Sequence, residues 1–72
     1  MYELWDLQSG NRIDVFPAEA DALAWVRQSV QEDGPEFAQE LALLRVDAES
    51  GRELTAQGEA LVKLARTQTP AA

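Results

Sequence analysis

The pattern Asp-x-x-Ser-Gly occurs twice in this chain of 72 residues, once from Asp6 to Gly10 and once from Asp47 to Gly51. Each copy lies between two short apolar runs, and a helix-like stretch follows each pair of runs. Glycine can take the positive φ that a tight hairpin turn needs, and Asp and Ser side chains accept hydrogen bonds from nearby backbone amides. The sequence therefore predicts two similar halves, each a β-hairpin followed by a helix.

These halves define the expected fold. The turn residues are Asp6, Ser9 and Gly10 in the first half and Asp47, Ser50 and Gly51 in the second. We expect strands at residues 2–7, 11–16, 41–47 and 52–57, and helices at residues 18–33 and 59–67. This is an α+β fold of two ββα units, with a four-stranded antiparallel sheet and two helices on one face. Residues 1–67 are expected to form a single domain, and residues 68–72 a flexible C-terminal tail.

The segment at residues 36–49 supports two interpretations. Phe37, Leu41 and Leu44 recur at helical spacing, and the segment is rich in good helix formers. The repeated turn that follows it favours a strand at residues 41–47. We keep the strand as the prediction and the helix as its alternative, and the prediction leaves room for a helical segment at residues 36–39 before the strand begins.

Three-residue turns would assign the strand side chains to two faces of the sheet. The face expected under the helices carries Trp5, Leu7, Ile13, Val15, Ala42, Leu44, Val46, Leu54 and Ala56. The opposite face carries Tyr2, Leu4, Phe16 and Leu43. Left uncovered, these four residues form an apolar patch of the kind that marks interaction sites. The alternative interpretation is that the four belong to the core.

The composition excludes several classes of function. Thirteen acidic residues against six basic ones give a net charge of −7, which disfavours binding to nucleic acid or to an anionic membrane. The chain has no cysteine and no histidine, so it lacks thiolate metal ligands and the commonest acid–base catalyst. No segment spaces oxygen ligands like a calcium-binding loop. We therefore expect no catalytic residues, no metal and no cofactor, and interpret the chain as a non-enzyme.

One acidic run has two interpretations. Glu32, Asp33, Glu36 and Glu40 have no basic residue among them. Such a run is either solvated surface or a docking patch for a basic partner, in which case binding falls with added salt.

The chain also lacks the signals that direct a protein to or through a membrane. It has no apolar run of about 18 residues, and the N-terminus lacks the basic start of a secretion signal. The sequence therefore predicts a cytoplasmic protein.

The N-terminal pattern Tyr-Glu-Leu-Trp-Asp-x-x-Ser-Gly-Asn is followed by Glu-Ala-x-Ala-Leu-Ala-x-Val-Arg and by Leu-Ala-Leu. Together these segments resemble a group of short, uncharacterised proteins from high-GC bacteria. The resemblance implies a small free-standing ββαββα domain and implies no activity.

The sequence thus predicts a small acidic protein-interaction module that forms a homodimer through the open face of its sheet, in an accessory or regulatory role. The partner is expected to be a second copy or another protein. Two alternatives remain. One is a small-ligand-binding domain or enzyme subunit, and the other is an acidic nucleic-acid mimic or antitoxin-like inhibitor.

Overall fold

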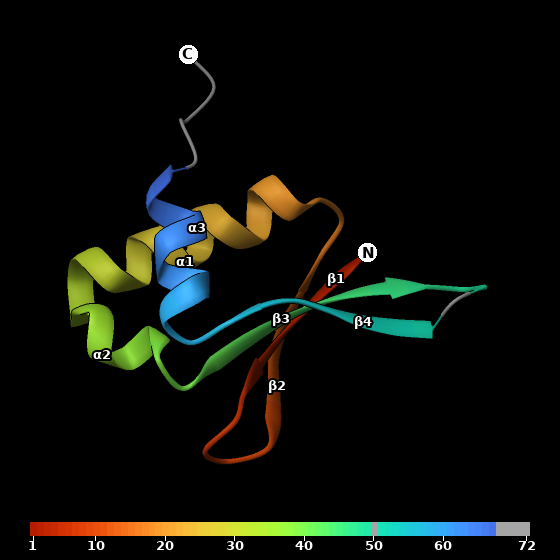
Figure 1. The fold of residues 1–72 in the computed structure, drawn as a ribbon, viewed down its shortest axis with the longest axis horizontal. Helices are drawn as coiled ribbons and strands as arrows, with labels where there is room; N and C mark the ends of the chain where they lie inside the picture. Colours follow the sequence, from red (N-terminus) through yellow and green to blue (C-terminus); the bar gives the residue numbers. More distant parts are fainter. Residues whose placement is uncertain (50, 68–72) are drawn as a thin grey trace.

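The chain forms a four-stranded sheet with helices on one face. The computed structural model describes residues 1–49 and 51–67. Its elements, in chain order, are β1 (Tyr2–Asp6), β2 (Asn11–Phe16), α1 (Glu19–Asp33), α2 (Pro35–Ala38), β3 (Leu41–Asp47), β4 (Gly51–Gln57) and α3 (Glu59–Thr67) (Figure 1). All neighbouring strands are antiparallel, in the order β2-β1-β3-β4. The predicted α+β fold is confirmed.

The segment at residues 36–49 is helical at its start and a strand in its later part. Pro35–Ala38 forms the short helix α2, and Leu41–Asp47 forms β3, so the predicted strand is confirmed. The structure therefore has a third helix in addition to the two predicted ones. The tail predicted at residues 68–72 lies outside the described residues.

Both hairpins close with the predicted turn chemistry. Gly10 and Gly51 have φ values of 72° and 78°. The backbone N–H two residues after each aspartate donates a hydrogen bond to its Oδ1, at 3.0 Å for Asp6 and 2.9 Å for Asp47. The Ser9 hydroxyl donates to the second carboxylate oxygen of Asp6 at 3.1 Å. The equivalent serine at position 50 lies outside the described residues.

The strand register differs in part from the one that three-residue turns predict. Residues 6 and 11 pair, which leaves four residues in the first loop, whereas residues 47 and 51 pair in the second hairpin. An irregularity between residues 4 and 5 of β1 restores the expected pairing in the first hairpin. In the second hairpin, an irregularity between residues 43 and 44 of β3 moves Ala56 opposite Leu43, on the other face from Leu54. The pairs Tyr2–Phe16 and Leu4–Asp14 keep the predicted register.

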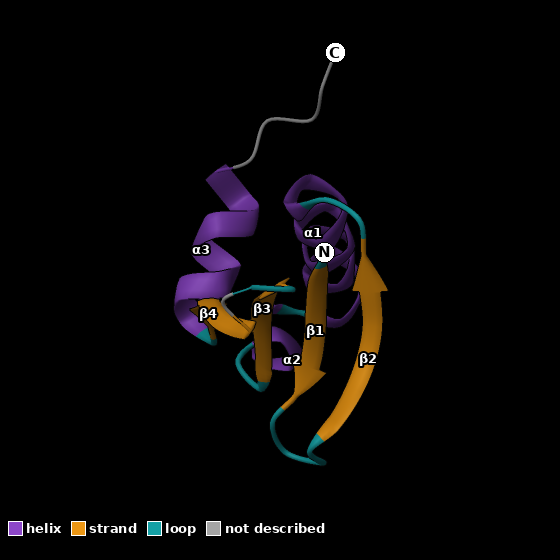
Figure 2. Ribbon diagram, turned by 90° about the vertical axis from the view of Figure 1, so that its right-hand side faces the viewer, coloured by secondary structure: helices purple, strands orange, loops and turns teal. Residues whose placement is uncertain are grey.

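Local signals position the helices. α1 begins after Ala18 without a side-chain cap, and it ends at Gly34, whose N–H donates to the Val30 carbonyl at 2.9 Å. The Gly58 N–H donates to the Leu41 carbonyl at 2.9 Å, which ties the start of α3 to the first residue of β3. α1 packs on β1 and β2, α3 packs on β3 and β4, and the two helices contact each other; Figure 2 shows α1 behind β1.

The core lies between the sheet and the helices. Its buried members are Leu4, Phe16, Ala22, Leu23, Val26, Ala38, Leu41, Leu43, Ala56, Leu61, Val62 and Ala65. Tyr2 is half-buried and packs against this cluster. The prediction of an exposed patch made by Tyr2, Leu4, Phe16 and Leu43 is therefore wrong, because Leu4 and Leu43 are 0% exposed and Phe16 is 8% exposed. The alternative, that these residues belong to the core, is the one the structure supports.

The error concerns which face the helices cover. Arg45 and Glu53 share a face with Leu43, and their polarity argued against placing that face under the helices. Both residues are exposed, and they lie toward the end of the β3–β4 hairpin that projects past the helices (Figure 1). Leu43, nearer the middle of the sheet, is covered. One face thus carries core residues at one end and solvated charges at the other.

Candidate interaction face

The side of the sheet opposite the helices carries the chain's candidate site. Side chains alternate along each strand, so the residues that alternate with the core positions point to this side. We call this surface the open face; its residues are Glu3, Trp5, Arg12, Val15, Ala42, Leu44, Val46, Arg52, Leu54 and Gln57. Most of its apolar members were predicted to lie under the helices, so the two faces exchange roles.

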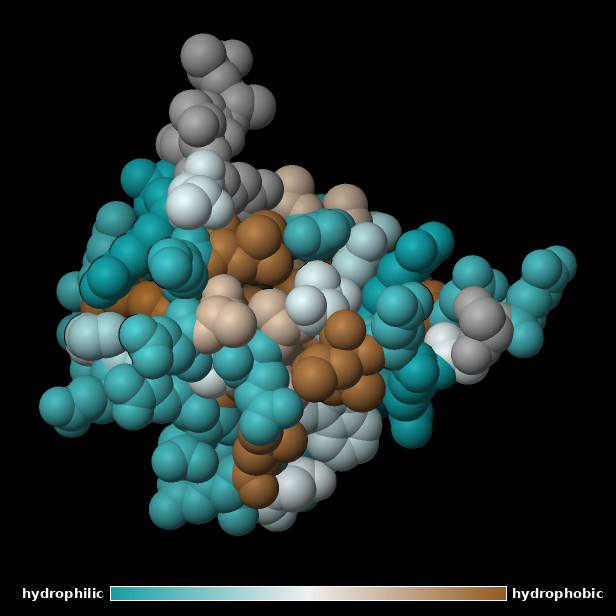
Figure 3. Space-filling view, viewed as in Figure 1, coloured by the Kyte–Doolittle hydropathy of each residue, from teal (hydrophilic) through white to brown (hydrophobic). Residues whose placement is uncertain are grey.

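Apolar side chains on the open face remain accessible. Trp5, Val15, Leu44 and Val46 are half-buried, and Leu54 is 53% exposed. They lie on all four strands of the sheet. Elsewhere on the described surface, hydrophobic residues also reach solvent, and Figure 3 shows several of them in the middle of the view with hydrophilic residues around them.

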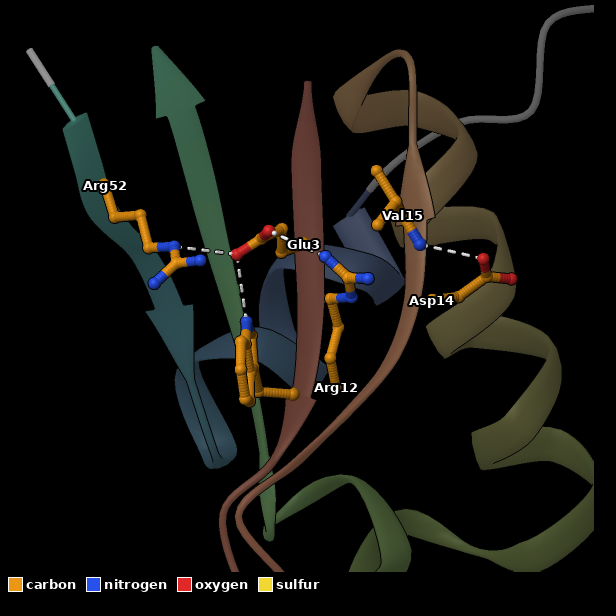
Figure 4. Close-up of polar contacts among 6 residues, drawn as sticks. Glu3, Arg12, Asp14, Val15 and Arg52 are labelled. Carbon is orange, nitrogen blue, oxygen red and sulfur yellow. Dashed lines mark hydrogen bonds and ion pairs between the residues drawn. The ribbon is translucent and has the colours of Figure 1, made fainter. Parts of the chain in front are cut away.

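A buried carboxylate organises the centre of the open face. Glu3 is 5% exposed although no helix covers it. Its Oε2 accepts a hydrogen bond from Arg12 Nη1 at 3.2 Å, and its Oε1 accepts one from Trp5 Nε1 at 3.2 Å. Oε1 also forms an ion pair with Arg52, whose Nε lies 3.0 Å away. Figure 4 shows Glu3 on β1 between Arg12, from β2, and Arg52, from β4. We call these four residues the Glu3 cluster.

The members of the Glu3 cluster also pack against one another. The Arg52 guanidinium carbon lies 5.8 Å from the centre of the Trp5 ring, within the range of a cation–π contact. The side chains of Arg12 and Arg52 are 52% and 58% exposed. Each arginine therefore covers Glu3 with its inner part and keeps its outer part in solvent, as long cationic side chains commonly do.

The pKa of Glu3 reflects this surrounding. Burial by itself raises the pKa of the carboxyl group, because it disfavours the charged form. The hydrogen bonds from Trp5 and Arg12 and the charges of Arg52 and Arg12 lower the pKa by more, so it lies below its ordinary value. Glu3 is therefore ionised at neutral pH and holds both arginines.

The open face differs from the rest of the chain in its charge. Glu3 is the one carboxylate among the ten residues of this face, and it stands against two guanidinium groups. The face thus carries one net positive charge on a chain whose net charge is −7. Another acidic molecule therefore meets less repulsion at the open face than over the acidic parts of the surface.

The predicted acidic patch is brought together in part. Asp33, Glu36 and Glu40 line a shallow depression of about 310 Å³ together with Asp6. Glu32 is not part of that lining and instead accepts a hydrogen bond at 3.3 Å from a glutamine on α1. Among residues 1–49 and 51–67, no group of acidic residues is arranged to hold a metal ion.

A groove between α1 and α3 is a feature that sequence reasoning missed. It has a volume of about 390 Å³ and is lined by Arg27, Val30, Gln31, Pro35, Val62, Ala65 and Arg66. The lining combines two guanidinium groups with an apolar floor. Because its residues come from three helices, only the packing of those helices reveals it.

The Glu3 cluster was also missed, although the sequence holds a signal for it. Glu3 stands between two core-type residues in an otherwise apolar strand. Arg12 and Arg52 both follow closely on the glycine of a repeated turn. A lone carboxylate in an apolar run with cations on other strands indicates an ion pair across the sheet.

Comparison with known proteins identifies no relative. Searches against protein-family models, curated proteins and solved structures found no match to this chain. In the part of the chain that the structure describes, no helix is both long and apolar enough to cross a membrane.

Proposed function

We propose that this protein is a small interaction module that pairs with a second copy of itself through the open face. The observation that carries the proposal is a sheet face without helices on which Leu54 is 53% exposed beside half-buried Leu44, Val46 and Trp5. Burying such side chains in a partner removes apolar surface from water, the main favourable term in most protein association.

Charge makes the open face a less repulsive contact between two copies than the acidic surfaces of the chain. Two chains of charge −7 repel each other over most of their surfaces. Contact through the open face places the single positive excess of each copy at the interface and turns the acidic surfaces outward. Arg12 and Arg52 keep N–H donors beyond those that bind Glu3, since a guanidinium has five, and these can reach acceptors of the partner.

The size of the face sets the strength of the dimer. Four strands at about 4.8 Å spacing make a face roughly 20 Å wide, and contacts between single small faces belong with the weaker, transient interfaces. We therefore expect a reversible dimer at micromolar or higher concentration, suited to an accessory or regulatory role.

The direct test is Leu54→Asp with Leu7→Asp as its matched control. Leu54 and Leu7 are 53% and 46% exposed, so neither substitution removes much burial within one chain. Leu7 follows the end of β1 in the first turn and pairs with no residue of the neighbouring strand β2. Size-exclusion chromatography with light scattering, over a concentration series, measures the mass of each variant.

The wild type and Leu7→Asp should approach the mass of two chains as concentration rises, and Leu54→Asp should remain at the mass of one. A wild type that stays at one chain up to millimolar concentration contradicts the proposal. So does a Leu54→Asp variant that dimerises as well as the wild type while keeping its circular dichroism spectrum.

A second candidate function, small-ligand binding, is supported by the groove between α1 and α3. Its volume of about 390 Å³ lies within the range of ligand sites, and Arg27 and Arg66 beside an apolar floor suit an apolar molecule with a carboxylate. Isothermal titration with decanoate tests this function. Saturable binding that Arg66→Glu weakens supports it, and the absence of heat with the wild type rejects it.

A further inference from the structure

β2 is an outer strand of the sheet, and the backbone hydrogen bonds show which of its groups face outward. The Val46 N–H donates to the Met1 carbonyl at 2.8 Å, and the Leu7 N–H donates to the Glu40 carbonyl at 2.7 Å. In an antiparallel pair, bonded and non-bonded residue pairs alternate. The odd-numbered residues of β1 therefore direct their N–H and C=O groups toward β3, and the even-numbered ones toward β2.

Val15 consequently faces away from the sheet. It pairs with Glu3, an odd-numbered residue whose backbone groups point to β3, so Val15 and Glu3 form a non-bonded pair. The backbone N–H and C=O of Val15 are thus exposed at the outer edge of β2, where another strand could bind them.

The Asp14 side chain occupies that donor. Its Oδ1 accepts a hydrogen bond from the Val15 N–H at 2.8 Å, as Figure 4 shows. Asp14 itself pairs with Leu4, whose backbone groups point toward β2, so Asp14 remains part of the ladder. The carboxylate thus removes an outward donor and adds a negative charge at the same point of the edge.

An irregularity in β2 reinforces this effect. Leu4 pairs with Asp14, but Trp5 pairs with Arg12, so Ile13 is an extra residue in β2. A regular edge presents outward groups on every second residue, whereas those of Arg12 and Val15 are three residues apart. An incoming regular strand cannot bond to both without its own irregularity.

We propose that Asp14 closes the β2 edge to strand addition by a second copy of this chain. It thereby confines self-association to the open face, and in this respect the inference rests on the proposed function. Charged side chains and bulges are known means by which edge strands avoid pairing with each other.

The opposite edge, β4, is disfavoured for self-pairing for a different reason. By the same alternation, Arg52 and Leu54 direct their backbone groups outward. If the β4 strands of two copies pair antiparallel, so that Arg52 of each bonds to Leu54 of the other, Glu53 lies directly opposite the Glu53 of the second copy. Like charges at opposed positions destabilise a strand pair.

The test is Asp14→Ala, made both in the wild type and in the Leu54→Asp variant whose open face is disabled. Asp21→Ala is the matched control, because it removes the same charge from an exposed position on α1. Light scattering over a concentration series gives the mass, and thioflavin T fluorescence reports ordered strand stacking.

Asp14→Ala should add self-association in both backgrounds. In the Leu54→Asp background its mass should rise from one chain to two or more, with the midpoint concentration lowered about tenfold, since the substitution frees the Val15 N–H for one further hydrogen bond and removes a repelling charge. Asp21→Ala should leave the midpoint unchanged. The Leu54→Asp background separates the two proposals. A wild type that is monomeric rejects the open-face dimer, but the effect of Asp14→Ala on the mass of the Leu54→Asp variant can still be measured.

Val15→Pro supplies a rescue. Proline has no N–H, and at an outward-facing edge position its ring costs no ladder bond. Added to Asp14→Ala, it should abolish the gained association, whereas Val15→Ala, which keeps the donor, should not. An Asp14→Ala variant that associates no more than Asp21→Ala overturns the proposal, and so does gained association that persists in a folded Asp14→Ala, Val15→Pro double variant.

Discussion

Replacing Glu3 by Gln tests the polar centre of the open face. Gln keeps an oxygen that can accept the Trp5 N–H, so the substitution chiefly removes the negative charge between Arg12 and Arg52. The two arginine side chains are 52% and 58% exposed, and ion pairs with exposed partners contribute about 0–1 kcal/mol each. Because Glu3 itself is only 5% exposed, we expect both pairs near the upper limit and a loss of about 1–2 kcal/mol at pH 7.

The loss should depend on pH in a definite direction. The pKa of Glu3 is lowered in the folded chain, so its ionised form stabilises folding above the ordinary carboxyl pKa. That contribution falls as the pH drops through the lowered pKa, and the glutamine of the variant cannot titrate. The difference between the wild type and Glu3→Gln should therefore be largest at neutral pH and should shrink toward about pH 3, below the ordinary Glu value of about 4.3.

Urea unfolding at both pH values, followed by tryptophan fluorescence, measures the difference. Glu49→Gln is the control, since Glu49 is an exposed turn residue with the same change of charge. The control should match the wild type within about 0.5 kcal/mol, as surface substitutions usually do. A Glu3→Gln deficit that is equal at pH 7 and pH 3, or no larger than that of the control, would refute the argument for a stabilising Glu3 cluster.

Two further predictions concern the core and the turns. Leu43→Ala should lower the free energy of unfolding in urea by about 2–5 kcal/mol, because Leu43 is 0% exposed. Leu54→Ala should lower it by less than about 1 kcal/mol in the monomer. Equal losses would contradict the assignment of the faces. Gly10→Ala and Gly51→Ala should each cost about 1–2 kcal/mol from the positive φ alone, since an added Cβ meets no atom within 4 Å. Unchanged midpoints in urea would show that the turns relax at no cost.

The sequence by itself determined the four strands, the helices α1 and α3, and most of the strand partners. The two Asp-x-x-Ser-Gly turns located both hairpins, because a glycine at positive φ and an aspartate that accepts a turn amide are local requirements. Alternation along the strands also grouped Leu4 with Phe16 and Leu44 with Leu54, as the pairing confirms.

Only the tertiary structure decided which group forms the core. Both faces carry apolar residues, so alternation separates Leu43 from Leu44 without saying which one the helices cover. That choice depends on where α1 and α3 pack along the strands, and they cover the middle of the sheet while the charged end near Arg45 projects past them. The same packing leaves Glu3 outside the core, where Arg12 from the adjacent strand β2 and Arg52 from β4, distant in sequence, cover its charge.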